Sequence, residues 1–332
     1  MSYIRQAKRP WPICSIGWGF FLFLGIAWAG SEAVQILVRF GTGPGQVSFI
    51  NARSHPGHQI PIPYGPRAFR IVGDACWIID TVGGKLLKFD LNGAFLDEHR
   101  LTDQPDSLIL EDLTPIFGPQ QTLTGWWTID GRASELLRLD PQGAIRQRLA
   151  IKDAVQPFRV ETGPAGEVYL ADKGARAIFQ IDPGSGAVIR KTPWEWSGLA
   201  VGAKSGNLYL LRFSATDRRS VLVSLDRQGR PKTRIVCDFP PHYNPDLVCV
   251  DEQRQEFVLT YLAYAPGHPS HHRTVALRCG WDGKIKGSAP LPADTGHLHR
   301  PLEWNGGSPY VATADYGRAP AGALRIARFF LP

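Results

Sequence analysis

The sequence predicts an all-β protein built from six similar four-stranded sheets, and three observations support this prediction. A phrase made of Trp77–Asp80 and Lys85–Gly93 returns 50 residues later as Trp127–Asp130 and Glu135–Gly143. Aspartates in the turns after the third strands recur at positions 90, 140, 182, 226 and 282. No long stretch after residue 40 has helical periodicity, and 35 Gly and 27 Pro suit short strands and turns. A repeat of this size predicts the blades of a six-bladed β-propeller.

Each repeat contains the same four strands in the same order. The first strand follows Pro or Gly, as in Pro66–Ile71, and the third reads Leu-Leu-x-Phe/Leu-Asp. An Asn-Gly or Gln-Gly turn then leads into a fourth strand such as Ala94–Leu96. The second strand is an aromatic or aliphatic run, and the six runs are Trp77–Asp80, Trp127–Asp130, Val168–Asp172, Leu208–Leu211, Phe257–Thr260 and Tyr310–Asp315. One such sheet cannot bury both of its faces, but six sheets packed around an axis can.

An additional strand at residues 34–40 precedes the first repeat, and the last repeat ends after its third strand, at Pro332. We infer that the N-terminal strand completes the last blade and closes the ring. Closure removes the free sheet edges that would otherwise template aggregation. The propeller is therefore predicted to span residues 30–332, and residues 1–29 form a separate segment.

The first three repeats are close to a known family of propellers. The motifs that carry the likeness are Phe40–Gln46, Gly65–Phe69, Trp77–Asp80 and Lys85–Asp90. With these motifs the chain resembles the six-bladed NHL-repeat propellers over roughly residues 34–329, and an insertion around residues 263–272 sets the fifth blade apart. The resemblance implies a fold and no activity, because this fold hosts scaffolds, hydrolases and lyases.

The N-terminal segment has the layout of an export signal. Arg5, Lys8 and Arg9 precede the apolar run Ile13–Ala27, and Ala27–Ala29 offers a small-x-small cleavage site. This pattern predicts a signal peptide over residues 1–29. The alternative is an uncleaved membrane anchor helix, because the run over residues 11–30 is just long enough to cross a bilayer. Both alternatives place the propeller outside the cytoplasm, in a bacterial periplasm, and an anchor would leave the N-terminus in the cytoplasm.

Four cysteines lie in the predicted propeller, which suits an oxidising compartment. Cys237 and Cys249 flank the connection into the fifth blade, so they are candidates for a disulfide; the alternative is that Cys76, Cys237, Cys249 and Cys279 are all small buried hydrophobes. The formal net charge of +7 is spread along the chain without a Lys/Arg block, which argues against nucleic acid as a partner.

Propellers bind ligands at the mouth of the central channel, where the innermost strand of each blade begins. In this sequence the charged, polar and aromatic residues near these strand starts are Arg67, Asp106, Arg159, Trp196, Asn244, Asp246, His299 and Arg300. They are the candidate ligand-binding residues. The alternative is that each is an ordinary turn residue, with Asp106 and Asn244 bonding to nearby backbone.

Three of these side chains, Asp106, Asp246 and His299, form a candidate site for one divalent ion, Ca, Zn or Mg. Such an ion would polarise a lactone or ester carbonyl and activate water. Six-bladed gluconolactonase-like enzymes place a Glu just before the Gly-Pro of their first blade, whereas Tyr64 precedes Gly65–Pro66 here. That departure counts against a lactonase. A nucleophile elbow, a P-loop and a dinucleotide fingerprint are also missing from the sequence.

The sequence therefore favours a protein-binding or scaffold module in a bacterial envelope complex, with a metal-dependent hydrolase or lyase as the alternative. Adjacent Trp126 and Trp127 point to opposite faces of their strand, so they are not expected to face inward together. Exposed rings of this kind anchor partner proteins or stack on sugars.

Overall fold

The computed structural model describes residues 35–51, 63–104, 107–194, 198–214, 219–238, 243–265, 268–292, 298–314, 316, 319 and 322–332. The chain divides into two units, Met1–Glu32 and Ala33–Pro332, and the second contains the whole described fold. The predicted signal peptide or anchor helix lies outside the described residues. Within them, no helix is long and apolar enough to cross a bilayer.

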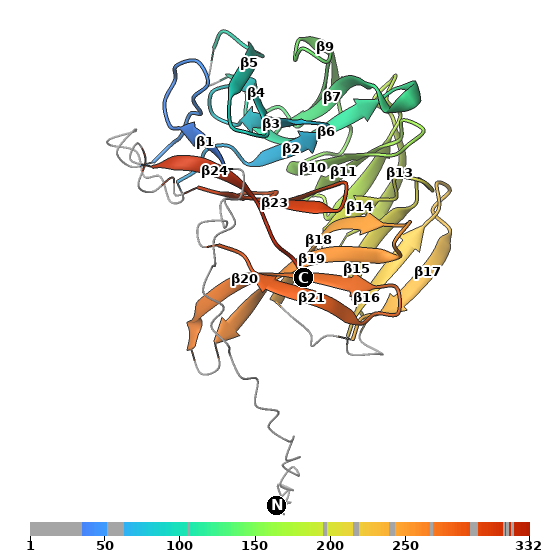
Figure 1. Cartoon of the computed structure of the whole chain (residues 1–332). Coiled ribbons are helices and arrows are strands. Elements are labelled where there is room, and N and C mark those ends of the chain that lie inside the picture. The colour runs from blue at the N-terminus through green and yellow to red at the C-terminus, as the bar shows by residue number, and fades with distance from the viewer. Residues whose placement is uncertain are drawn as a thin grey trace, which may run out of the picture. The chain divides into compact units, whose positions relative to one another are not determined.

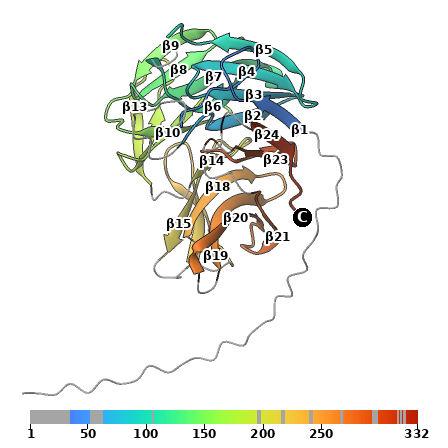
Figure 2. The same ribbon diagram turned by 90° about the vertical axis from the view of Figure 1, so that its left-hand side faces the viewer.

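Six four-stranded antiparallel sheets form the predicted six-bladed propeller (Figures 1 and 2). The first blade contains β2 (Ala68–Val72), β3 (Ala75–Asp80), β4 (Lys85–Asp90) and β5 (Phe95–Arg100). The second contains β6 (Leu110–Phe117), β7 (Leu123–Asp130), β8 (Glu135–Leu139) and β9 (Ile145–Ala150), with the short 3-10 turn η2 (Pro119–Gln121) between β6 and β7. The third contains β10 (Pro157–Thr162), β11 (Val168–Asp172), β12 (Ala177–Ile181) and β13 (Val188–Pro193).

The remaining blades follow the same order, and the last one takes its fourth strand from the start of the fold. The fourth blade contains β14 (Leu199–Val201), β15 (Leu208–Ser214), β16 (Arg219–Leu225) and β17 (Pro231–Val236). The fifth contains β18 (Tyr243–Asp251), β19 (Glu256–Ala265), β20 (His268–Gly280) and β21 (Ile285–Pro290). The sixth contains β22 (Leu302–Asn305), β23 (Ser308–Thr313), β24 (Ala323–Arg328) and β1 (Gln35–Arg39). In Figure 2 the blue β1 lies beside the red β24, with which it pairs.

Among the described residues the core consists of six apolar clusters, one between each pair of neighbouring blades. Both faces of a blade are therefore buried, which explains why Trp126 and Trp127 are both inside. Trp126 packs toward the first blade and Trp127 toward the third, and each ring is at most 2% exposed. Adjacent rings on opposite faces both face inward here, because each face of the sheet is covered by a neighbouring blade.

Two sets of aspartates explain the repeat seen in the sequence. The turn aspartates bind the backbone of their own hairpin: Asp90 Oδ1 accepts from the amides of Asn92 at 2.9 Å and Ala94 at 2.7 Å. The aspartates that end the second strands instead bind the loop that leads into an inner strand. Asp172, for example, accepts from the amides of Val155 at 2.7 Å and Gln156 at 3.1 Å. In the third blade this aspartate thus holds the start of the inner strand β10.

The fifth blade departs from the others, as the sequence indicates. Its second and third strands, β19 and β20, are 10 and 13 residues long, whereas the corresponding strands of the first blade, β3 and β4, have 6 each. The residues of the predicted insertion extend this hairpin.

Candidate functional site

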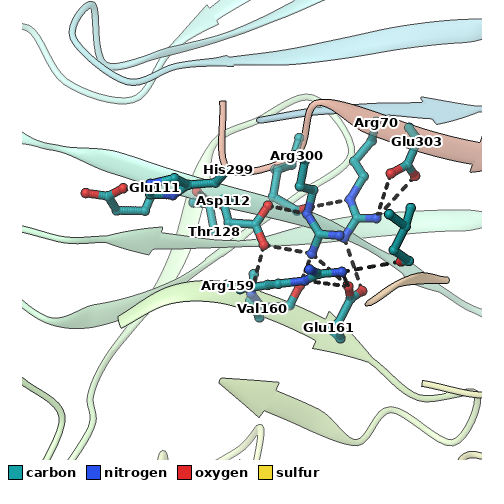
Figure 3. A network of polar contacts seen from close by, with 12 residues as sticks. Arg70, Glu111, Asp112, Thr128, Arg159, Val160, Glu161, His299, Arg300 and Glu303 are labelled. Carbon is teal, nitrogen blue, oxygen red and sulfur yellow. Dashed lines mark hydrogen bonds and ion pairs between the residues drawn. The ribbon is translucent and has the colours of Figure 1, made fainter. Parts of the chain in front are cut away.

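The inner strands β2, β6, β10, β14, β18 and β22 surround the axis, and their first residues meet at one end of it, which we call the mouth. Figure 3 shows charged side chains that meet at the axis, from the inner strands and from His299 and Arg300, which precede β22. We divide the side chains near the axis into two groups. The channel network comprises Arg70, Asp112, Arg159, Glu161, Asp246, Arg300 and Glu303, and the mouth cluster comprises Arg67, Glu111, Phe158, Lys173 and His299.

Arg300 is the central cation of the channel network. Its Nε and Nη2 donate to the two carboxylate oxygens of Asp112 at 2.6 and 2.8 Å. Nη2 also donates to Glu161 Oε1 at 2.8 Å and to the Val160 carbonyl at 3.0 Å. Asp112 has no measurable exposure, and its Oδ2 accepts a further bond from the Val160 amide at 2.8 Å. This pair joins the sixth blade to the second and third.

Two further guanidinium groups complete the network (Figure 3). Arg70 donates to both oxygens of Glu303 at 3.1 Å, to Glu161 Oε2 at 3.1 Å and, through Nε, to the Leu113 carbonyl at 2.6 Å. Arg159 donates to Asp246 Oδ1 at 3.0 Å and to the Leu247 carbonyl at 3.0 Å. The network thus joins five blades.

The number of neighbouring cations determines which carboxyl groups of the network have a lowered pKa. Burial alone would raise the pKa of Glu161, but Arg300, Arg70 and Arg159 outweigh burial and lower that pKa to about 2. Glu303 has fewer cationic neighbours, so burial raises its pKa. Burial also raises the pKa of Asp246 despite Arg159. Asp246 keeps 36% of its side chain exposed, more than the other carboxylates of the network.

At the mouth, Glu111 lies between a cation and an imidazole. Arg67 Nη1 donates to Glu111 Oε2 in a close ion pair, and His299 Nδ1 lies 3.3 Å from the same oxygen. That contact lacks hydrogen-bond geometry, so the buried Nδ1 has no hydrogen-bond partner. Burial raises the pKa of Glu111, and burial together with Arg67 and Lys173 holds the pKa of His299 well below its usual range. His299 is therefore neutral at pH 7.

Lys173 follows β11 and reaches the mouth over the Phe158 ring, with Nζ 4.3 Å from the ring centroid. Its backbone amide donates to the Gln156 carbonyl at 3.0 Å. Burial lowers the pKa of Lys173. Phe158 also meets the His299 ring edge to face at 5.8 Å and lies 5.2 Å from the Trp194 ring.

The structure brings five of the eight predicted mouth residues to the axis. Arg67 and His299 lie in the mouth cluster, whereas Arg159, Asp246 and Arg300 belong to the channel network. The backbone of Asn244 lies on β18, and its side chain is outside what the structure describes. Asp106 and Trp196 also lie outside the described residues.

Sequence reasoning predicted Asp246 but missed the other four carboxylates, Arg70 and Lys173. In the second blade the inner strand was expected to begin near Asp106, but β6 begins at Leu110, so Glu111 and Asp112 were overlooked. Charged residues inside the short apolar inner strands are a sequence feature that could have identified part of the site. They are Arg70, Glu161 and Glu303.

The predicted disulfide between Cys237 and Cys249 is not formed, and both thiols are free. Cys237 follows β17 and packs between the fourth and fifth blades, whereas Cys249 on β18 packs between the fifth and sixth. The sheet of the fifth blade therefore separates the two sulfur atoms. Cys237 instead behaves as a small buried hydrophobe, and burial raises its pKa to about 11.

Asp246 and His299, the two predicted metal ligands that the structure describes, are poorly placed to bind a divalent ion. Asp246 bonds to Arg159, and His299 faces Glu111, which Arg67 already neutralises. In the described ranges, no group of three or more His, Cys, Asp or Glu side chains is placed to hold a metal. The third predicted ligand, Asp106, lies outside those ranges, so the metal site stays a prediction.

No family model matches this sequence, and neither does any curated protein. Solved structures do show similarity. A member of the DUF4221 family from Bacteroides vulgatus has a TM-score of 0.55 at 9% identity, over 90% of this chain and 96% of that one. Virginiamycin B lyase from Staphylococcus aureus has 0.52 at 12%, over 80% and 95%. Hydrazine synthase from Kuenenia stuttgartiensis has 0.51 at 14%, over 77% and 75%. At these identities the likeness shows the propeller fold alone.

Proposed function

We propose that this propeller is a non-catalytic protein-binding module. The observation that carries the proposal is the channel network, which fills the axis with guanidinium–carboxylate pairs. A cavity of about 100 Å³ remains at the far side of the network, lined by residues that include Arg70, Glu161 and Glu303. That volume is small, because pockets for drug-sized ligands measure ~300 Å³ or more.

The network favours a structural role for the axis. Paired guanidinium and carboxylate groups from five blades hold the inner strands in one arrangement, because breaking a buried pair leaves an uncompensated charge. A rigid platform lowers the entropy that a binding surface loses when a partner docks.

The face around the mouth has the mixture of groups found at protein interfaces. Val155 is 65% exposed beside the loop that carries Lys173. Phe158 and Trp194 lie behind them, and Arg67 is partly exposed. An apolar centre with arginine and aromatic neighbours is typical of a hot spot.

The cellular place is part of the same proposal. The basic residues, apolar run and cleavage site of the N-terminal segment support export of the propeller across the inner membrane. An uncleaved segment would also hold the propeller at the membrane through residues 11–30. Protease added to spheroplasts should digest the propeller, whereas protection until lysis would refute the export.

Affinity capture from envelope extracts tests the binding function. The tagged full chain should retain one protein at a near-stoichiometric ratio, and Val155→Asp should lose it because a charge then occupies the apolar part of the face. Leu37→Asp is the matched control, since Leu37 is also an exposed apolar residue but lies on the outer strand β1. Equal capture by both variants, or no stoichiometric protein at all, would contradict the proposal.

A second candidate is a hydrolase or lyase at the mouth, and one observation favours it. Glu111 and His299 touch, and their pKa values shift in opposite directions, which is a common arrangement of acid–base pairs. Metal analysis tests the metal-dependent form. Near one equivalent of Ca, Zn or Mg that survives dialysis, and is lost in Asp246→Asn, would favour the enzyme over the binding module.

A further inference from the structure

We infer that the mouth cluster binds the carboxylate of an acidic side chain on the partner protein. The inference rests on the proposed binding function and names the chemistry that the partner must present. It uses Lys173, His299 and Phe158, whose contacts differ from those of every charged group deeper in the channel.

Lys173 is the one cation of the mouth cluster and the channel network that forms no ion pair with a described residue. Arg67 is paired with Glu111, and Arg159 is paired with Asp246. Lys173 forms neither an ion pair nor a hydrogen bond from its ammonium group with any described residue; its one contact of this kind is with the Phe158 ring. Glu111 and Asp246 attract this ammonium group without an ion pair, and an incoming carboxylate at hydrogen-bond distance would give it a direct partner.

Lys173 is also held in place before any ligand arrives. Asp172, its neighbour, accepts backbone bonds from Val155, Gln156 and Ala175, the last at 2.7 Å. The Lys173 amide itself is bonded to Gln156. The loop that carries the ammonium group is therefore anchored to the start of the inner strand β10, and a pre-ordered loop loses little entropy on binding.

His299 gives an independent indication of a ligand. Its Nδ1 is buried and lacks a hydrogen-bond partner, whereas most buried polar atoms in proteins have one. The nearest carboxylate oxygen, Glu111 Oε2 at 3.3 Å, is already paired with Arg67, so in the tautomer with a proton on Nδ1 the neutral ring can turn and donate to an incoming carboxylate instead. Lys173 and His299 both pack on Phe158, so a donor and a cation converge on one ring.

The ring also suits the rest of an acidic side chain. Phe158, which is partly exposed, packs against the buried Trp194 and forms an apolar wall. The methylene groups of a glutamate can pack on this wall while its carboxylate meets the two polar groups. A free phosphate, in contrast, would leave the wall unused.

A pair of small probes tests the charge requirement. We propose ligand-observed NMR titrations of the full chain with N-acetyl-glutamate N-methylamide and with the corresponding glutamine compound, which differ in the side-chain carboxylate alone. The glutamate probe should bind at least about tenfold more tightly, because a charge-assisted hydrogen bond is lost in the amide. Equal binding of the two probes, or no binding of either, would overturn the inference.

Variants at Lys173 locate the effect. In Lys173→Gln the affinity for the glutamate probe should fall to that for the glutamine probe, and Lys173→Arg should keep most of it. Matching thermal midpoints will show that both variants are folded. If Lys173→Gln binds the glutamate probe as the wild type does, the carboxylate site is not at this lysine and the inference fails.

Capture experiments separate this inference from the proposed function. If Lys173→Gln loses both the probe and the partner, the acidic side chain of the partner is supported. If the wild type captures a partner and Lys173→Gln captures it equally well, the inference fails and the binding function stands. If no partner is captured but the glutamate probe binds through Lys173, the protein-binding function fails and a free small carboxylic acid becomes the ligand.

Discussion

The channel network and the mouth cluster lie on one axis and use the same kinds of side chain, but they differ in how completely those side chains are paired. Each side chain of the network has a hydrogen-bonded partner, and the network joins five blades. At the mouth, Lys173 has no carboxylate partner among the described residues, and the buried His299 Nδ1 has no hydrogen bond. Polar groups that have hydrogen-bond partners hold a structure together, whereas polar groups without such partners are available to a ligand.

The largest expected effect comes from removing the central cation of the network. Arg300→Met should lower the free energy of unfolding by about 3–5 kcal/mol, because Asp112 stays buried without its cation. Arg325→Met is the control, since Arg325 is exposed on β24 and its loss should cost less than about 0.5 kcal/mol. Urea denaturation followed by tryptophan fluorescence measures both. Similar losses in the two variants would remove the distinction between the channel and the surface.

A smaller loss of stability is expected when the pH is lowered. The pKa of Glu161 is depressed to about 2, so its ionised form contributes stability above its unfolded pKa, about 4.3. That contribution, on the order of 2–3 kcal/mol, is lost as the pH falls from about 4.5 toward 2. Glu303 and Asp246 have raised pKa values and act in the opposite direction, since their cost to stability appears as the pH rises.

Glu161→Gln removes the depressed carboxyl and keeps the raised ones. Its thermal midpoint should therefore fall less between pH 4.5 and pH 2 than that of the wild type, although it is lower at pH 7. Glu135→Gln, at a largely surface-exposed ion pair with Arg148, should keep the wild-type slope. Parallel curves for Glu161→Gln and the wild type would show that the network does not hold this carboxylate ionised.

Removing a turn aspartate at the outer edge of a blade should lower the free energy of unfolding by about 1 kcal/mol. This effect lies away from the axis and gives a reference for the effects there. Asp140 Oδ1 accepts backbone bonds from Gln142 at 3.1 Å and Ala144 at 2.8 Å. Asp140→Ala leaves these two amides to water and should cost about 1 kcal/mol. Asp97→Ala, at an exposed aspartate of β5, should be neutral in the same thermal melt. A cost as large as that of Arg300→Met would mean that the turns stabilise the fold as much as the axis does.

The smallest effect on stability is expected at the mouth. Lys173→Gln should change the free energy of unfolding by less than about 0.5 kcal/mol, because no buried partner is left behind. Differential scanning calorimetry at pH 7 measures this change. A loss of several kcal/mol would show that Lys173 belongs to the structural network.

The fold could be predicted because its signals are local. Asp90 and Asp140 bind amides two and four residues away, so the same short phrase builds the same hairpin in each blade. The last-blade strand expected at residues 34–40 corresponds to β1, which pairs with β24. The NHL assignment, the export signal and the partner stay predictions.

The site was less accessible to sequence reasoning because its contacts are distant in the chain. Arg300 and Asp112 are 188 residues apart, and a pair of this kind has no short motif. Arg300 was expected at a ligand-binding mouth, but the structure uses it as an internal cation. Lys173 was overlooked although it directly follows Asp172, whose type of position recurs in the blades.

The most direct test of this division compares stability and binding in one protein, Lys173→Gln. We expect a thermal midpoint equal to that of the wild type together with at least an about tenfold loss of affinity for N-acetyl-glutamate N-methylamide. Unchanged affinity, or a midpoint that falls as far as that of Arg300→Met, would contradict the distinction between a structural channel and a binding mouth.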